Sequence, residues 1–192
     1  MKSIASLREV FAQIPDSKDP YAYPLEGVVT LICLAMMCGP NGEREIARWA
    51  QAQRWDLAER LGFPREKMPS LGTIQEALRR IPPTLFTSLV SGWGEQVLQV
   101  HGGAEGKGIA IDGKVVRGSR TDEQDAVHLL SALAHDLKLV LGQTPVPDHT
   151  NEMGGIDPWW ADLVLEGRIV TVDAHLTQRD IADTVREKGG TT

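Results

Sequence analysis

Two aspartates end short apolar segments and are the residues best suited to chemistry in this sequence. Asp112 ends the segment Ile-Ala-Ile-Asp, and Asp173 ends the segment Val-Thr-Val-Asp. Both segments are rich in β-branched residues and lie close to glycines, which is typical of buried strands. Neighbouring strands lie about 4.8 Å apart, so two aspartates at matching heights could share a divalent ion or bridge a pair of ions about 3.5–4 Å apart.

Carboxylate oxygens are suited to Mg²⁺, and a two-metal site holds the attacking and leaving oxygens of a phosphodiester in line. From the residues alone, a second interpretation stays open. Aspartate before glycine is common in turns, so either side chain could simply cap the end of its strand.

The segment after the first aspartate is basic, with Lys114, Arg117 and Arg120. Beside a metal site these side chains could contact DNA phosphates, which attract Lys and Arg regardless of base sequence. A solvated turn explains the same three residues equally well. The surrounding half of the chain is acidic, which would make Mg²⁺ more important for the approach of DNA.

The spacing of apolar residues predicts a change of architecture near residue 107. Helical spacing favours helices within 7–14, 25–38, 43–62, 72–81 and 84–100. Later come strands at 108–113, 126–135, 138–146 and 167–175, with a turn at Asp136 and Leu137 and helices that begin near Asp157 and at Thr177, the second ending before Gly189. The order strand, strand, strand, helix, strand, helix is the opening of a ribonuclease-H-like α/β domain, whose first and fourth strands lie side by side. We therefore expect the strands that end at Asp112 and Asp173 to be adjacent and parallel. We therefore expect a helical domain over 1–100, a linker at 101–107 and part of a ribonuclease-H-like domain over 108–192.

Composition describes a soluble globular protein. The chain has 192 residues, of which 42% are hydrophobic and 24% charged. Lys plus Arg balance Asp plus Glu up to Gly103, so the net charge of −6 belongs to the remainder. The apolar run at 25–39 is shorter than the ~20 residues of a membrane span, and no export signal is recognisable, so we expect a cytoplasmic protein without a membrane partner. Cys33 and Cys38 are expected to be core thiols.

The helical half contains one segment with helix-turn-helix character, at 69–81. Ser70 or Thr73 is suited to cap a helix that presents Gln75, Arg79 and Arg80, and Gln and Arg side chains can read base edges in the major groove. The zero net charge of this half argues against a DNA reader. The alternative is a helical bundle that packs on the catalytic domain or forms a homo-oligomer.

The tryptophans of the helical half are expected to serve packing. Trp49, Trp55 and Trp93 fall on predicted helices at positions suited to a core.

Several motifs, in order along the chain, resemble the H-repeat-associated, ISAs-type insertion-sequence transposases, a branch of the DDE superfamily. They are YPLEGVVTLICLAMMCG, EIARWA, IAIDGKVVRGS, AVHLLSALAHDLKLVLGQ, NEM and EGRIVTVDAHLTQRDIA. The resemblance implies an N-terminal transposase-associated domain, a catalytic domain with a D, D, E triad that binds Mg²⁺ or Mn²⁺, and transposon ends and target DNA as partners. Asp112 matches the first acid of the triad and Asp173 the second.

The chain departs from this pattern in two ways. It stops at Glu-Lys-Gly-Gly-Thr-Thr, before the position of the third acid, so it is expected to be C-terminally truncated and inactive as it stands. Glu152 belongs to the Asn-Glu motif and precedes Asp173, so its position does not match the third acid. His175 follows the second acid closely and is either a surface residue or an added ligand or phosphate contact.

The expected function is metal-dependent DNA cleavage and strand transfer by an insertion-sequence transposase, of which this chain is an incomplete part. The alternative is a non-catalytic remnant, or a repurposed protein, that binds DNA or a full-length transposase.

Overall fold

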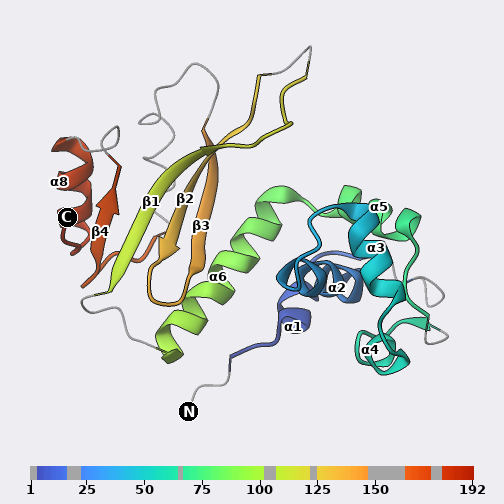
Figure 1. The fold of residues 1–192 in the computed structure, drawn as a ribbon. Coiled ribbons are helices and arrows are strands. Elements are labelled where there is room, and N and C mark those ends of the chain that lie inside the picture. Colours follow the sequence, from blue (N-terminus) through green and yellow to red (C-terminus); the bar gives the residue numbers. More distant parts are fainter. Residues whose placement is uncertain are drawn as a thin grey trace. The chain divides into compact units, whose positions relative to one another are not determined.

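The computed structural model describes residues 4–16, 23–64, 67–101, 107–121, 125–146, 163–173 and 179–192. The chain divides into two compact units (Figure 1). The helical unit is Ala5–Leu89, and the sheet unit is Val90–Thr192 together with Met1–Ile4. The helix predicted to begin near Asp157 lies outside the described residues. The candidate accessory residues Glu152 and His175 lie outside them as well.

The helical unit is built from short helices around one apolar helix. Its elements are α1 (Leu7–Phe11), α2 (Leu25–Met37), α3 (Glu43–Gln51), α4 (Trp55–Arg60), α5 (Leu71–Arg80) and the first residues of α6 (Pro83–His101). Helix α2 is apolar on most of its surface and packs against α1, α3 and α5. It is thus the predicted core helix. No helix within the described part of the chain is both long and apolar enough to cross a membrane.

One predicted helix, over 43–62, is divided in the structure. Helix α3 ends at Gln51, where the Gln53 side chain donates to the Trp49 carbonyl at 2.9 Å, and α4 starts afresh at Trp55. Gly62, with a φ of 75°, closes α4 in a Schellman arrangement. The break turns Trp55 outwards, with 58% of the residue exposed, so the prediction that it serves the core is wrong.

The two cysteines also differ from the prediction that both are core thiols. Cys38 follows the last residue of α2 and is exposed, so it is not a core thiol. Cys33 is half-buried, and desolvation raises the pKa of its thiol to about 11.

The sheet unit contains a four-stranded sheet in the order β3-β2-β1-β4. The strands are β1 (Gly108–Val115), β2 (His128–Ala134), β3 (Leu139–Val146) and β4 (Ile169–Val172). Neighbours pair antiparallel except β1 and β4, which are parallel. The turn predicted between β2 and β3 is confirmed, and so is the final helix, α8 (Arg179–Glu187), which ends before Gly189 at a φ of 75°.

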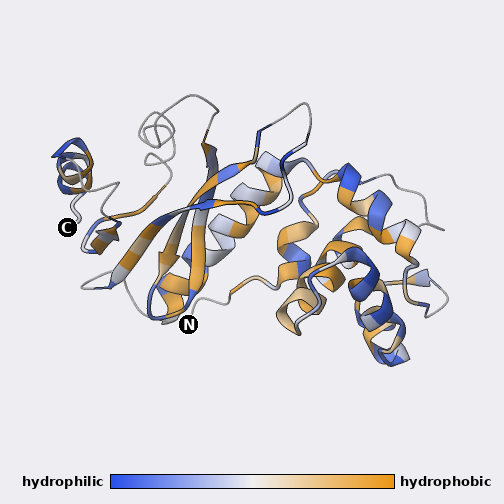
Figure 2. Cartoon of the chain, turned by 45° about the horizontal axis from the view of Figure 1, so that its top comes forward, coloured by the Kyte–Doolittle hydropathy of each residue, from blue (hydrophilic) through white to orange (hydrophobic). Residues whose placement is uncertain are grey.

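One face of this sheet is covered by helices. The inward-facing side chains of the strands form a core with Leu98 of α6 and with Ile181 and Val185 of α8. Figure 2 shows the hydrophobic stretches along the strands that build this core. Residues with the opposite alternation therefore lie on the other face.

The pair Glu95–Arg168 connects α6 to the start of β4. Arg168 is 2% exposed, and its Nη1 and Nη2 atoms donate to the two carboxylate oxygens of Glu95 at 3.2 and 2.9 Å. The backbone of the same arginine accepts a hydrogen bond from the Thr191 amide at 2.8 Å. Thr191 also forms a parallel bridge with Ile169, so the end of the chain lies along the outer edge of β4.

We predict that Gly27→Ala destabilises the helical unit. A Cβ at residue 27 of α2 would collide with the Leu61 carbonyl and lie 3.0 Å from the Phe63 ring. Overpacking costs ~1–3 kcal/mol, more than the ~1 kcal/mol of helix propensity that alanine adds. Urea unfolding should show a lower midpoint. Gly92→Ala in α6 is the control, because its Cβ would meet no atom within 4 Å and should leave stability unchanged or raised. An unchanged midpoint for Gly27→Ala would contradict this packing.

A second prediction concerns Glu95→Ala, which leaves the buried Arg168 charge without its carboxylate. Removing one partner of a buried ion pair costs ~3–5 kcal/mol. The free energy of unfolding should fall by that amount, whereas Asp183→Ala should change it by less than ~1 kcal/mol, because its pair with Arg186 is exposed. Equal effects of the two variants would show that the Glu95 contact is not buried in solution.

Candidate metal-binding and nucleic-acid site

The parallel pairing of β1 and β4 brings the two candidate acids together. The register runs from Gly108 opposite Ile169 to Ile111 opposite Val172. Asp112 follows Ile111 within β1, and Asp173 directly follows the last residue of β4, so the same register continued by one residue would set them side by side. Parallel partners lie about 4.8 Å apart with their side chains on one face. The prediction that these strands are adjacent and parallel is confirmed.

Both aspartates are exposed, because the alternation of β1 sends them away from the core. Ile109 and Ile111 are buried at 1% and 2%, so Asp112 lies on the open face of the sheet. Its partner on β2 is Ser131, whose hydroxyl accepts a hydrogen bond from the Gln143 amide of β3 at 3.0 Å. The open face thus carries a polar row across four strands.

Ser131 and Gln143 were not recognised from the sequence. The segment Leu-Leu-Ser-Ala-Leu-Ala holds the signal for Ser131, since Leu130 and Ala132 point inwards and leave the serine on the opposite face. Only the pairing of β2 with β3 brings Gln143 beside it.

Two of the predicted phosphate-binding cations lie next to this row. Lys114 and Arg117 line a hollow of about 460 Å³, together with Val115, Val116, Leu129, Ser131 and Gln143. Arg120 does not line it; its Nη2 atom lies 3.7 Å from Asp125 Oδ1, with both side chains exposed. The structure therefore brings Lys114 and Arg117, but not Arg120, to the hollow beside Asp112.

The predicted base-reading residues of α5 have partners within the helical unit. Ser70 caps the helix by accepting from the Thr73 amide, as predicted. The three side chains contact acidic groups: Gln75 contacts Glu43 at 2.7 Å, Arg79 contacts Glu76 at 3.5 Å, and Arg80 contacts Asp16. Contact with DNA by these residues would have to replace those interactions.

Comparison with known proteins agrees with the resemblance. Residues 8–94 match the DDE_Tnp_1-associated family. The chain is 27% identical, over 97% of its length, to "H repeat-associated putative transposase YhhI" and to "H repeat-associated putative transposase YbfD", both of Escherichia coli (strain K12). The chain is thus similar to putative transposases associated with the H repeat. The match covers 50% of YhhI and 74% of YbfD, so the chain spans about half the length of the first of these relatives.

Among solved structures, the piggyBac transposase synaptic complex with hairpin DNA contains a chain that aligns with 97% of this chain and 45% of its own length. The sequence identity is 15% and the TM-score 0.43, which is too low to define the fold.

The two aspartates suit a divalent ion in donor type and exposure. They offer carboxylate oxygens on an open face, where water can complete an octahedral shell. Within the described residues, no group of three or more His, Cys, Asp and Glu side chains could hold an ion. The site is therefore suited to weak binding of Mg²⁺ or Mn²⁺.

We predict weak binding of Mg²⁺ or Mn²⁺ that Asp112→Asn and Asp173→Asn each abolish, because either change removes half of the protein's charge at the site. Calorimetric titration of the full chain measures it. Asp136→Asn is the matched control: this exposed aspartate lies in the turn after β2, at the opposite end of the same sheet, and pairs with Lys107 at 3.2 Å. Equal ion binding by all four proteins would remove the metal assignment.

Proposed function

We propose that this chain takes part in metal-dependent DNA cleavage and strand transfer, as a DDE-type insertion-sequence transposase of the cytoplasm. The observation that carries the proposal is the β1–β4 register: continued by one residue, it would bring Asp112 next to Asp173 on the open face, near the hollow that Lys114 and Arg117 line. The relatives named transposases support it, and so does the DDE_Tnp_1-associated match of the helical half.

Each part of the open face has a role in this proposal. Asp112 and Asp173 hold the divalent ions, Mg²⁺ or Mn²⁺. Lys114 and Arg117 bind phosphates of the DNA backbone and keep the strand along the hollow. Bound ions would supply activation of water or of a 3′-hydroxyl and stabilise charge on the phosphodiester. Glu152 and His175 stay candidate accessory ligands.

The fold proposed for 108–192 is the N-terminal part of a ribonuclease-H-like domain. The described order of three antiparallel strands followed by a strand parallel to the first supports it. The helix expected between β3 and β4 lies outside the described residues.

A second candidate function is binding of DNA, or of a full-length transposase, without catalysis. One observation favours it: the described site gathers two carboxylates and no third ligand. We propose that two carboxylates, the ligands gathered within the described residues, are too few to keep a second ion in line with a phosphodiester.

The test is nicking of a supercoiled plasmid that carries the DNA flanking this gene. We expect the 192-residue chain to bind the plasmid but not to nick it with Mg²⁺ or Mn²⁺. We expect the longest open reading frame that contains the chain, where it is longer, to nick the plasmid and to lose this activity on Asp112→Ala.

Lys114→Gln and Arg117→Gln should each weaken DNA binding. Arg120→Gln is the matched control, because Arg120 lies outside the hollow. Nicking by the 192-residue chain that Asp112→Ala abolishes would show that two aspartates suffice. DNA binding that neither Lys114→Gln nor Arg117→Gln weakens would contradict the role of the open face.

A further inference from the structure

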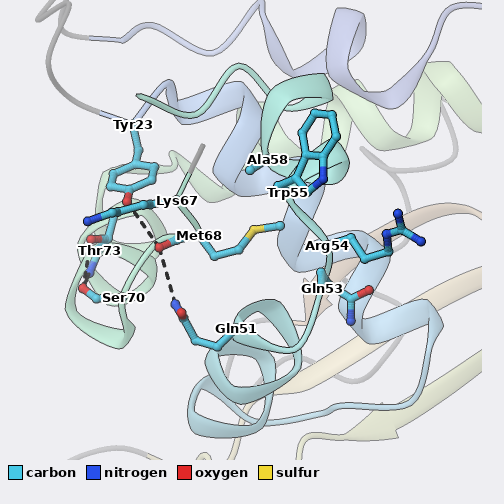
Figure 3. Close-up of a pocket in the computed structure, with 10 residues that line it drawn as sticks. All are labelled: Tyr23, Gln51, Gln53, Arg54, Trp55, Ala58, Lys67, Met68, Ser70 and Thr73. Atoms are coloured by element: carbon cyan, nitrogen blue, oxygen red, sulfur yellow. Dashed lines mark hydrogen bonds between the residues drawn. The ribbon is translucent and has the colours of Figure 1, made fainter. Parts of the chain in front are cut away.

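The helical unit contains a pocket that the proposed chemistry does not use (Figure 3). Its volume is about 530 Å³, within the ~300–1,000 Å³ typical of ligand sites. The residues that line it are Tyr23, Gln51, Gln53, Arg54, Trp55, Ala58, Lys67, Met68, Ser70 and Thr73. This described lining includes two cations and no carboxylate.

One wall of the pocket is held in place by hydrogen bonds. The Tyr23 hydroxyl donates to the Met68 carbonyl at 3.2 Å, and the Gln51 amide donates to the Met68 and Pro69 carbonyls at 3.4 and 3.1 Å. Figure 3 shows two of these bonds meeting at Met68, whose side chain extends across the pocket towards Trp55. A wall fixed in this way loses little freedom when a ligand binds.

The opposite wall presents an exposed aromatic ring. Trp55 is the first residue of α4 and is 58% exposed, although tryptophan is highly buried on average. Helix α4 is anchored instead by Ala58, which is fully buried, with the adjoining Leu61 at 4% exposure. The indole is thus available to a ligand at the pocket.

The two cations flank the pocket. Figure 3 shows Lys67 and Arg54 on opposite sides of it, with their charged groups far apart. The Arg54 side chain is 85% exposed, and its Nε atom lies 3.9 Å from Asp56, an exposed pair that contributes little. Both cations can therefore turn to an anionic ligand.

We propose that this pocket binds a nucleotide of an unpaired DNA strand, with its base stacked on Trp55 and the flanking phosphates on Lys67 and Arg54. Stacking on an aromatic ring next to a positively charged groove is how single-stranded nucleic acid is bound without regard to sequence. A base that is paired in a duplex cannot enter a concave pocket of this kind without leaving its stack. Two cations and no carboxylate in the described lining favour a polyanion over a peptide.

The inference deepens the proposed function, since it names an unpaired strand as a DNA state that the chain binds. It needs neither the metal nor the aspartates of the sheet unit. Binding is therefore measured without divalent ions and repeated in Asp112→Asn, so that a failed metal site leaves the result intact.

The probe is a fluorescein-labelled oligonucleotide of about 16 nucleotides, the upper site size of a single-strand-binding fold, titrated with the full chain by anisotropy. Trp55→Ala should weaken binding by about 5- to 150-fold, the equivalent of ~1–3 kcal/mol per stacked base. Trp55→Phe should keep most of the affinity. Lys67→Gln should lower the slope of log affinity against log salt by about 0.7, the loss of one phosphate contact on a single strand.

Arg48→Gln is the matched control, because Arg48 is an exposed cation of the same unit outside the pocket lining. Circular dichroism establishes that each variant is folded. Unchanged affinity of folded Trp55→Ala would overturn the proposal, and so would equal binding of the oligonucleotide and its duplex. A change of oligomeric state in Trp55→Ala without a change in DNA affinity would show that the ring contacts protein, which also overturns it.

Discussion

The ion pair between Glu95 and Arg168 is the contact on which the sheet unit depends. It joins α6 to the residue that precedes β4, and the backbone of that same residue accepts the amide of Thr191 at the chain end. A buried pair gains little net stability, because both charges lose their water. Its value here is geometric: two parallel hydrogen bonds in a fixed fork allow β4 to dock in one position against the helix.

That position decides whether the chain has a site at all. Side chains alternate along a strand, so a slip of one residue in the β1–β4 pairing would turn Asp173 to the face opposite Asp112. Val170 and Val172 resist such a slip, because it would exchange them for Thr171 in the core. The polar site on one face is therefore set by apolar packing on the other.

The sequence predicted the strands, because glycine-bounded β-branched segments are a local signal, and the order of the elements predicted the parallel pair. The role of the two aspartates stays a prediction. It did not predict the exposure of Trp55, since the break before α4 depends on contacts made around it. The burial of Arg168 was not predicted, because a lone arginine in a sequence normally indicates an exposed side chain. Its burial depends on the carboxylate of Glu95, which is far away in the sequence. The glycine-rich segment 101–107 stays a predicted domain boundary, although α6 already contributes Leu98 to the sheet core.

The strand order also has a kinetic consequence. Strands β1, β2 and β3 follow one another in the chain, and each pairs with its neighbour in sequence, so they can assemble early by local contacts. The pairing of β4 with β1 joins residues far apart in the chain, which costs more loop entropy and slows folding. The two acids therefore come together only when β4 docks on β1, so the proposed metal site is completed late in folding.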